Sequence, residues 1–322
     1  MYTSILVPLD RSPFAESAAA YGAALAAASH GSLHLVLVHT IVAWPATAEP
    51  ERYAELDAET RSAEMTYLVR LAERIERETG VRAVPRLIEG SVAHSLLDYA
   101  DRHDVDLIVM SSHGRGGVQR VWLGSVTNEV LRHAAVPLIV MRPAAGKPLE
   151  PAAPNVMPAD PFRRVLVALD GNELAEAALD AALDLPLAPD AEVVALRVIH
   201  PPAAVSPYLP HTIDATRTEM RKLKNDAEDY LLVTEKRRTG RAAIVARSTF
   251  ATDPATTILA HAERGDTDLI VLGTHARGGL ARAMLGSVAD RVIRGAHVPV
   301  FVMPVRALAN PRVPTEDALA SA

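Results

Sequence analysis

Glycine and serine at a strand-to-helix junction are the residues of this sequence best suited to binding chemistry. Gly124 and Ser125 stand where a segment punctuated by glycines ends and a helical pattern begins. A helix N-terminus presents unpaired N–H groups and the positive end of the helix dipole, so it binds phosphate readily. Glycine lets the backbone approach a ligand closely, and serine can cap the helix or hold a phosphate oxygen. The pattern therefore predicts a phosphate-binding site at this junction.

The chain contains this pattern twice. Residues 104–142 match residues 266–304 at 21 of 39 positions without a gap. In the second segment, Gly286 and Ser287 occupy the places of Gly124 and Ser125. A repeat of this length and regularity predicts two copies of one module.

The spacing of these small residues resembles the nucleotide-binding signature of the universal stress protein family, G-x-x-G followed by nine residues and then G-(S/T). The frame is Ser111, Gly114, Gly124 and Ser125 in the first copy, and Gly273, Ala276, Gly286 and Ser287 in the second. Each copy departs from the signature at one position: Ser111 replaces the first glycine in the first copy, and Ala276 replaces the second glycine in the second copy. The resemblance covers nearly the whole chain. It implies a tandem protein that binds ATP, ADP or AMP, with Mg²⁺ held only through the nucleotide phosphates.

The resemblance also implies which residues form the two sites. Asp10 and Asp170 end the first strand of each module and are expected at the adenosine, although an Asp there can also simply cap the next turn. Backbone groups at Thr40 and Val198 are expected to read the adenine. The first site comprises Pro8, Leu9, Asp10, Thr40, Met110, Ser111, Gly114, Gly124, Ser125 and Val126. The second comprises Ala168, Leu169, Asp170, Val198, Leu272, Gly273, Ala276, Gly286, Ser287 and Val288.

The second site is expected to bind the nucleotide in the same way but more weakly. The methyl group of Ala276 narrows the loop where the first module has Gly114, and Thr252 stands where the first module has Gly90. Replacing Gly124 by Val is expected to weaken binding with little loss of stability, because the bulk falls where the backbone approaches phosphate.

Other residues of the repeated loop have structural as well as functional explanations. We interpret His113 and His275 as loop-structuring residues, because no second His or Cys converges on them to make a catalytic or metal site. For Arg115 and Arg277, simple exposure to solvent and contact with a β- or γ-phosphate are equally good explanations. His39 is interpreted as a strand-end residue. No nucleophile elbow, HExxH pair or P-loop occurs, so we predict no catalytic residue and at most slow ATP hydrolysis.

Composition excludes several classes of protein. The 322 residues carry a net charge of −6, which argues against nucleic-acid binding. The absence of cysteine rules out disulfides and thiolate metal sites and is compatible with the cytoplasm. The N-terminal residues lack the pattern of a signal peptide and read directly as a strand, and no segment is long enough to span a membrane.

Alternating strand and helix patterns predict an α/β fold with two tandem doubly wound, five-stranded, parallel-sheet (Rossmann-like) domains. The family resemblance implies the strand order 3-2-1-4-5. We expect domains at 1–145 and 161–306, a proline-rich linker at 146–160 and a flexible tail at 307–322. The apolar fifth strands, 138–141 and 300–303, lie at sheet edges and predict an intramolecular pseudo-dimer of the two domains, with a homodimer of chains beyond it.

Three functions fit these features. The leading interpretation is an adenine-nucleotide-binding regulator of the stress response that acts through protein partners the sequence does not identify. The first alternative is a dimeric scaffold of the same fold that no longer binds nucleotide. The second is a weak ATPase or phosphotransferase.

Overall fold

The structure is a computed structural model. It describes residues 1–40, 50–112, 123–142, 162–202, 210–238, 242–274 and 285–310. The expected linker at 146–160 lies outside these ranges. None of the described helices is long and apolar enough to cross a membrane.

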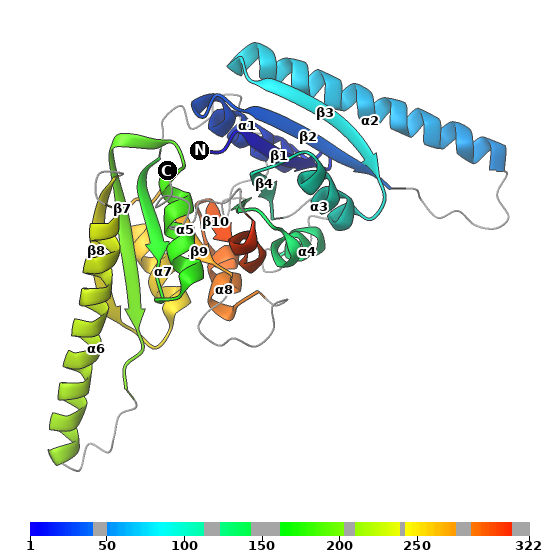
Figure 1. Cartoon of the computed structure of the whole chain (residues 1–322). Helices are drawn as coiled ribbons and strands as arrows, with labels where there is room; N and C mark the ends of the chain where they lie inside the picture. The colour runs from blue at the N-terminus through cyan, green and yellow to red at the C-terminus, as the bar shows by residue number, and fades with distance from the viewer. Residues whose placement is uncertain are drawn as a thin grey trace.

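Ten strands form one continuous sheet (Figure 1). The first half contributes β1 (Ser4–Leu9), β2 (Ser32–His39), β3 (Arg82–Glu89), β4 (Leu107–Ser111) and β5 (Leu138–Met141). The second contributes β6 (Phe162–Ala168), β7 (Leu187–Ile199), β8 (Ala243–Phe250), β9 (Leu269–Gly273) and β10 (Val300–Met303). Their order is β3-β2-β1-β4-β5-β10-β9-β6-β7-β8. Each half therefore has the predicted order 3-2-1-4-5, with parallel neighbours.

The two halves join through their fifth strands, as the edge-strand argument predicts. β5 and β10 are antiparallel, and Ile139 lies opposite Phe301. Both side chains are fully buried. Because this pairing covers one edge of each five-stranded sheet, it gives the chain a single ten-stranded sheet with the two modules facing each other.

Helices cover both faces of the sheet. One face carries α1 (Pro13–Ala28), α2 (Pro50–Thr79), α5 (Glu173–Leu183) and α6 (Pro210–Arg237). The other carries α3 (Val92–Arg102), α4 (Ser125–His133), α7 (Pro254–Arg264) and α8 (Ser287–Gly295). Alternate residues of β1 serve the two faces: Ile5 and Val7 pack on one side and Leu6 on the other. This explains why the strands read as unbroken apolar runs.

The repeated aspartates Asp106 and Asp268 have a structural role. Asp106 accepts hydrogen bonds from the N–H groups of Thr3 at 2.7 Å and Ser4 at 3.1 Å. Asp268 accepts hydrogen bonds from the backbone N–H groups of Arg163 and Arg164, each at 2.8 Å. In each module the Asp just before the fourth strand thus fixes the beginning of the first strand.

Two boundaries differ from the sequence-based expectation. β7 begins at Leu187 rather than near Glu192, because Leu187 pairs with Phe162 ahead of a register shift. The expected tail includes Ala307, but this residue is fully buried in a short 3-10 helix, Val305–Ala309. The side chain of Asn310 then donates a hydrogen bond to the carbonyl of Ala135 at 2.8 Å, so ordered packing continues to residue 310.

Candidate nucleotide site

The carboxyl ends of β1 and β4 meet at the point where the strand order reverses. β1 pairs with β2 on one side and β4 on the other, with Ile5 opposite Leu107. Asp10 follows β1 directly, and Ser111 ends β4. Ligands of open parallel sheets bind at such a reversal, outside the strand ends. The fold therefore brings Asp10 and Ser111, two residues of the predicted first site, to the same end of the sheet. β6 and β9 do the same for Asp170 and Gly273 of the second site.

Glycine is required at the start of α4. Its N–H group donates a hydrogen bond to the carbonyl oxygen of Ser112 at 2.9 Å, and a Cβ at Gly124 would lie 2.8 Å from the same oxygen. A side chain there would displace backbone, so the expectation that Gly124→Val leaves stability nearly untouched does not fit the packing. The second module repeats the turn, since Gly286 donates to the carbonyl of Thr274 at 2.6 Å.

The first N–H groups of α4 and α8 have no side-chain cap among the described residues. Gly124 and Gly286 are the N-cap residues, and neither helix shows a side-chain capping hydrogen bond. Ser125 and Ser287 are the first helical residues, and both are exposed. Neither hydroxyl caps its helix in the part of the chain that the structure describes.

Asp10 and Asp170 are tied to the turns that follow their strands. Oδ1 of Asp10 accepts hydrogen bonds from the N–H of Ser12 at 3.0 Å and from its hydroxyl at 2.6 Å. Ser12 in turn caps α1 by accepting from the N–H of Ala15 at 3.1 Å. In the second module the side chain of Asn172 donates to Asp170 at 2.9 Å and caps α5. Both carboxylates are half-buried and organise the entry to the next helix.

The strand register corrects the position equivalent to Thr40. Leu9 lies opposite Leu37 in the first module, and Ala168 lies opposite Leu196 in the second. Since Asp10 and Asp170 are equivalent, this register makes His200 the counterpart of Thr40. Val198 lies inside β7, opposite Thr249. The sequence contained this signal, because Thr40 lies 30 residues after Asp10 and His200 lies 30 residues after Asp170.

Gly273 is required by packing. A Cβ at this position would lie 2.9 Å from Cγ of Leu174 on α5. Its counterpart Ser111 keeps a side chain and accepts at its carbonyl a hydrogen bond from the hydroxyl of Thr127 at 3.1 Å. The second module therefore needs glycine at this position, whereas the first accommodates the side chain of Ser111.

The remaining predicted residues fall into three groups. The side chains of Leu9, Met110, Leu169 and Leu272 are buried in the core, so only their backbone can face a ligand. Pro8, Val126, Ala168 and Val288 are half-buried near the same edges. Gly114, Ala276, His113, His275, Arg115 and Arg277 lie outside the described residues.

The neighbourhood of Gly90 also differs between the modules. Gly90 has φ +122°, a conformation that favours glycine. In the second module Thr252 is followed by Asp253, which Arg291 contacts with two nitrogens at 2.8 and 2.6 Å. Hydrogen bonds from Arg291, then from Thr256, lower the pKa of Asp253 to about 2. This carboxylate is therefore ionised throughout the physiological range, and the Arg291 guanidinium balances its charge.

Sequence reasoning missed a charged network around His39. Its ring nitrogens lie 2.7 Å from Oε2 of Glu64 and 2.8 Å from Oδ1 of Asp57, both on α2. Asp57 also accepts from Nε of Arg61 at 2.7 Å, and Arg61 contacts Glu89 at the end of β3. The signal available in the sequence was the spacing of Asp57, Arg61 and Glu64 on one face of a helix.

The network favours the charged form of His39. Burial of the ring lowers the pKa of His39, but the hydrogen bonds that the ring donates to Glu64 and Asp57 and the negative charges of these carboxylates outweigh burial, so the pKa lies above its ordinary value. The ring is 4% exposed. An imidazolium between two carboxylates therefore fixes α2 against the end of β2, directly before Thr40.

Comparisons with known proteins agree with this architecture. A model of the universal stress protein family matches residues 1–142 and again residues 161–304. A universal stress protein of Mycolicibacterium smegmatis is 28% identical over 311 residues, covering 93% of this chain and 96% of that protein. One from Mycobacterium tuberculosis is 26% identical over 307 residues, covering 92% and 96%. The crystal structure of a universal stress protein from Archaeoglobus fulgidus has a TM-score of 0.61 at 21% identity, covering 93% and 95%, and shows the shared fold.

Proposed function

The chain belongs to the universal stress protein family, and on that premise we propose that it is a cytoplasmic regulator of the stress response that binds an adenine nucleotide. Its domains run from 1 to 145 and from 161 to 306, with the linker at 146–160 between them. ATP is the preferred ligand, with ADP or AMP as further candidates, and Mg²⁺ enters with the phosphates. The regulator works through partner proteins that respond to the occupied state.

The observation that carries the proposal is the glycine-initiated helix start at Gly124. A backbone turn that admits no Cβ brings the uncapped N–H groups of α4 to the edge of the sheet where the strand order reverses. Uncapped N–H groups and the helix dipole both favour a phosphate at that position. The exposed hydroxyl of Ser125 adds a donor at the same place.

The adenosine lies on the β1 side of this helix start. Thr40 leads out of β2 beside the His39 network, which fixes the backbone that would read the adenine. Asp10 and the Ser111 end of β4 flank the ribose and α-phosphate, and Ser125 with Val126 holds the outer phosphates. No described residue of this edge is an evident base for activating water, so hydrolysis is slow.

One observation favours the scaffold alternative. Asp10 and Asp170 both engage the turns that follow them, so each has a structural reason to be an aspartate without any nucleotide. Calorimetric titration of the purified protein with ATP, ADP and AMP separates the two functions. Saturable heat for at least one nucleotide supports the regulator, and its absence at millimolar ligand supports the scaffold. Phosphate release measured at a known protein concentration tests the weak ATPase: turnover of about one per second or faster would favour an enzyme over a regulator.

A further inference from the structure

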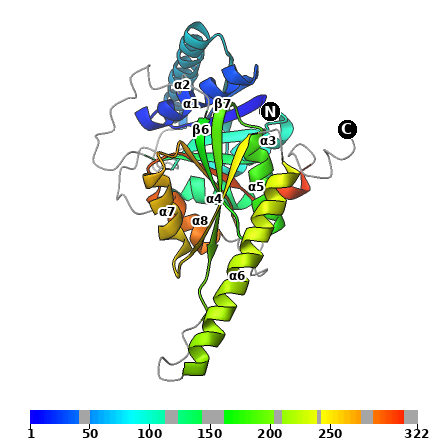
Figure 2. The ribbon, with the colours of Figure 1, turned by 90° about the vertical axis from the view of Figure 1, so that its left-hand side faces the viewer.

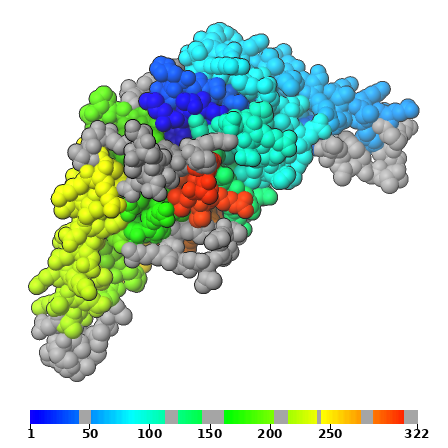
Figure 3. Space-filling model, in the orientation of Figure 1, coloured from blue at the N-terminus to red at the C-terminus, as the bar shows by residue number. Residues whose placement is uncertain are grey.

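Two long helices extend past the sheet that they cover. α2 has 30 residues and α6 has 28, which makes them about 45 and 42 Å long at 1.5 Å per residue. β3 and β8, on which they pack, have 8 residues each and span only about 26 Å. Figures 1 and 3 show both N-terminal halves protruding, at opposite ends of the molecule, and Figure 2 shows the same for α6 from the side. We call residues 51–66 the α2 arm and residues 215–226 the α6 arm.

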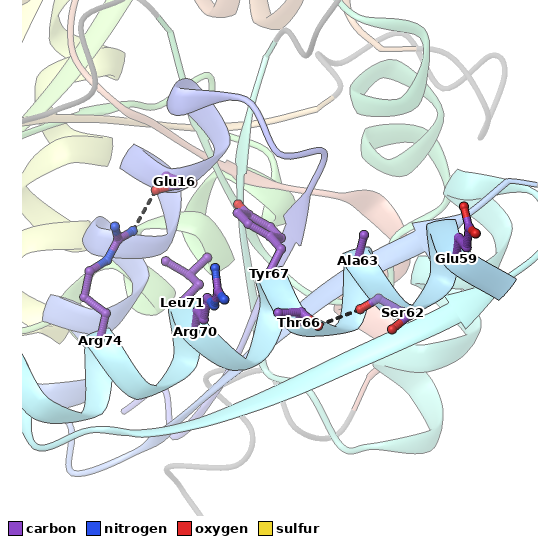
Figure 4. A pocket seen from close by; sticks show the side chains of 9 residues that line it. All are labelled: Glu16, Glu59, Ser62, Ala63, Thr66, Tyr67, Arg70, Leu71 and Arg74. Carbon is purple, nitrogen blue, oxygen red and sulfur yellow. Dashed lines mark hydrogen bonds and ion pairs between the residues drawn. The ribbon is translucent and has the colours of Figure 1, made fainter. Parts of the chain in front are cut away.

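The α2 arm borders an open groove and carries an acidic row. The groove, about 620 Å³ in volume, lies between α1 and α2 (Figure 4). Ala63, Tyr67 and Leu71 line its α2 wall, and the ion pair of Glu16 with Arg74 at 2.6 Å bridges it. Leu56, 41% exposed, lies on the same face of α2 as Ala63 but nearer the tip of the arm, so the two residues form an apolar line along the helix. The acidic row consists of Glu51, Glu55 and Glu59, all exposed and spaced four residues apart along that line.

The α6 arm has the opposite charge and a matching apolar line. Arg217, Arg221 and Lys224 are exposed and form a row at spacings of four and three residues. Met220 and Leu223 lie beside this row and are half-buried. They continue the stripe of Ala227, Leu231 and Thr234 by which α6 packs on the sheet. The α6 arm carries four basic side chains and two acidic, whereas the α2 arm carries five acidic and two basic.

We propose that the α6 arm of one copy of this chain packs into the α1–α2 groove of a second copy. Met220 and Leu223 meet the line of Leu56 and Ala63, and the basic row of one arm faces the acidic row of the other. Within one chain the two arms lie at opposite ends of the molecule, so they meet only between copies. Two such contacts related by a two-fold axis use both arms of both copies and give a closed dimer.

Charge reversal tests this arrangement on the full chain by sedimentation velocity at low and moderate salt. We expect the wild type to be a dimer that weakens as salt rises. Glu55→Lys with Glu59→Lys, and separately Arg217→Glu with Arg221→Glu, should each weaken self-association at least tenfold. An equimolar mixture of the two variants should form a heterodimer of normal affinity, because a basic arm then meets an acidic arm at both contacts.

Glu73→Lys with Glu78→Lys is the matched control, since it makes the same charge change on the part of α2 that lies over the sheet. The control should remain dimeric, and circular dichroism should show all variants folded. A wild type that is monomeric at about 100 µM would overturn the proposal, because the groove would then not bind a second copy of the chain. So would a dimer that survives both reversals, or reversed variants that fail to associate when mixed.

Discussion

At the residue scale, the first module differs from the second by a charged histidine. His39 is buried between Glu64 and Asp57, whereas the register places Ile199 at the equivalent position. The His39 network joins α2 to the ends of β2 and β3 through Arg61 and Glu89. It therefore fixes the base of the α2 arm and the backbone that leads to Thr40, and the described residues of the second module show no equivalent network.

The His39 network predicts a pH-dependent stability. Because the pKa of His39 is raised in the folded state, its contribution is fully present below the unfolded value near 6.5 and is lost as pH rises through the folded pKa. The pKa of Asp57 is lowered, first by its hydrogen bond with His39, so its contribution is lost only in acid. We expect His39→Gln to lower Tm more at pH 6 than at pH 9, by several degrees. A Tm difference that is constant between these pH values would show that the ring contributes only by packing.

At the element scale, the sequence predicted most of the architecture. The continuous apolar runs, the glycine junctions and the repeat led to every strand, because buried parallel strands and their helices leave strong local patterns. The order 3-2-1-4-5 was implied by the resemblance to the universal stress protein family. The equivalence of Thr40 and His200 was also within reach of the sequence, since each lies 30 residues after the aspartate that follows the first strand of its module. The need for glycine at position 273 was not, because the side chain that forbids a Cβ is Leu174, far away in the sequence.

The contact between α5 and β9 gives an element-scale prediction. Gly273→Ser introduces the residue found at the equivalent position 111, yet its Cβ would lie 2.9 Å from Leu174, so it should destabilise the protein by about 1–3 kcal/mol. Chemical denaturation measures this loss, and Ser111→Gly, at the equivalent position, should cost no more than about 1 kcal/mol. In a double-mutant cycle, Leu174→Ala should remove most of the penalty of Gly273→Ser. Strictly additive effects would rule out the steric explanation.

At the scale of the whole molecule, the antiparallel pair of β5 and β10 turns two modules into one body. Ile139, Val140, Phe301 and Val302 are completely buried at this junction. Tyr2 adds a cross-module contact by donating a hydrogen bond to the carbonyl of Ala181 at 3.0 Å. The modules therefore hold together by packing and hydrogen bonds as well as by the covalent connection.

Cutting the connection should leave the two modules associated. With a protease site introduced between residues 146 and 160, the cleaved halves should co-elute in size-exclusion chromatography at micromolar concentration, because separation would expose two apolar strand edges. Uncleaved protein carrying the same site is the control. Free separation of the halves at that concentration would contradict an intramolecular pseudo-dimer.

The central claim is that the N-terminus of α4 binds the phosphates of an adenine nucleotide, and titration calorimetry of Ser125→Asp with ATP tests it most directly. A carboxylate at the first position of a helix stabilises that helix by about 0.3–1 kcal/mol but repels phosphate. Ser287→Asp makes the same change at the start of α8 and is the matched variant for the weaker site. We predict that Ser125→Asp keeps or raises Tm and loses the tighter ATP site, while Ser287→Asp retains it. ATP binding that is unchanged in the double variant would contradict the claim, and loss of the tighter site in Ser287→Asp alone would reverse the ranking of the modules.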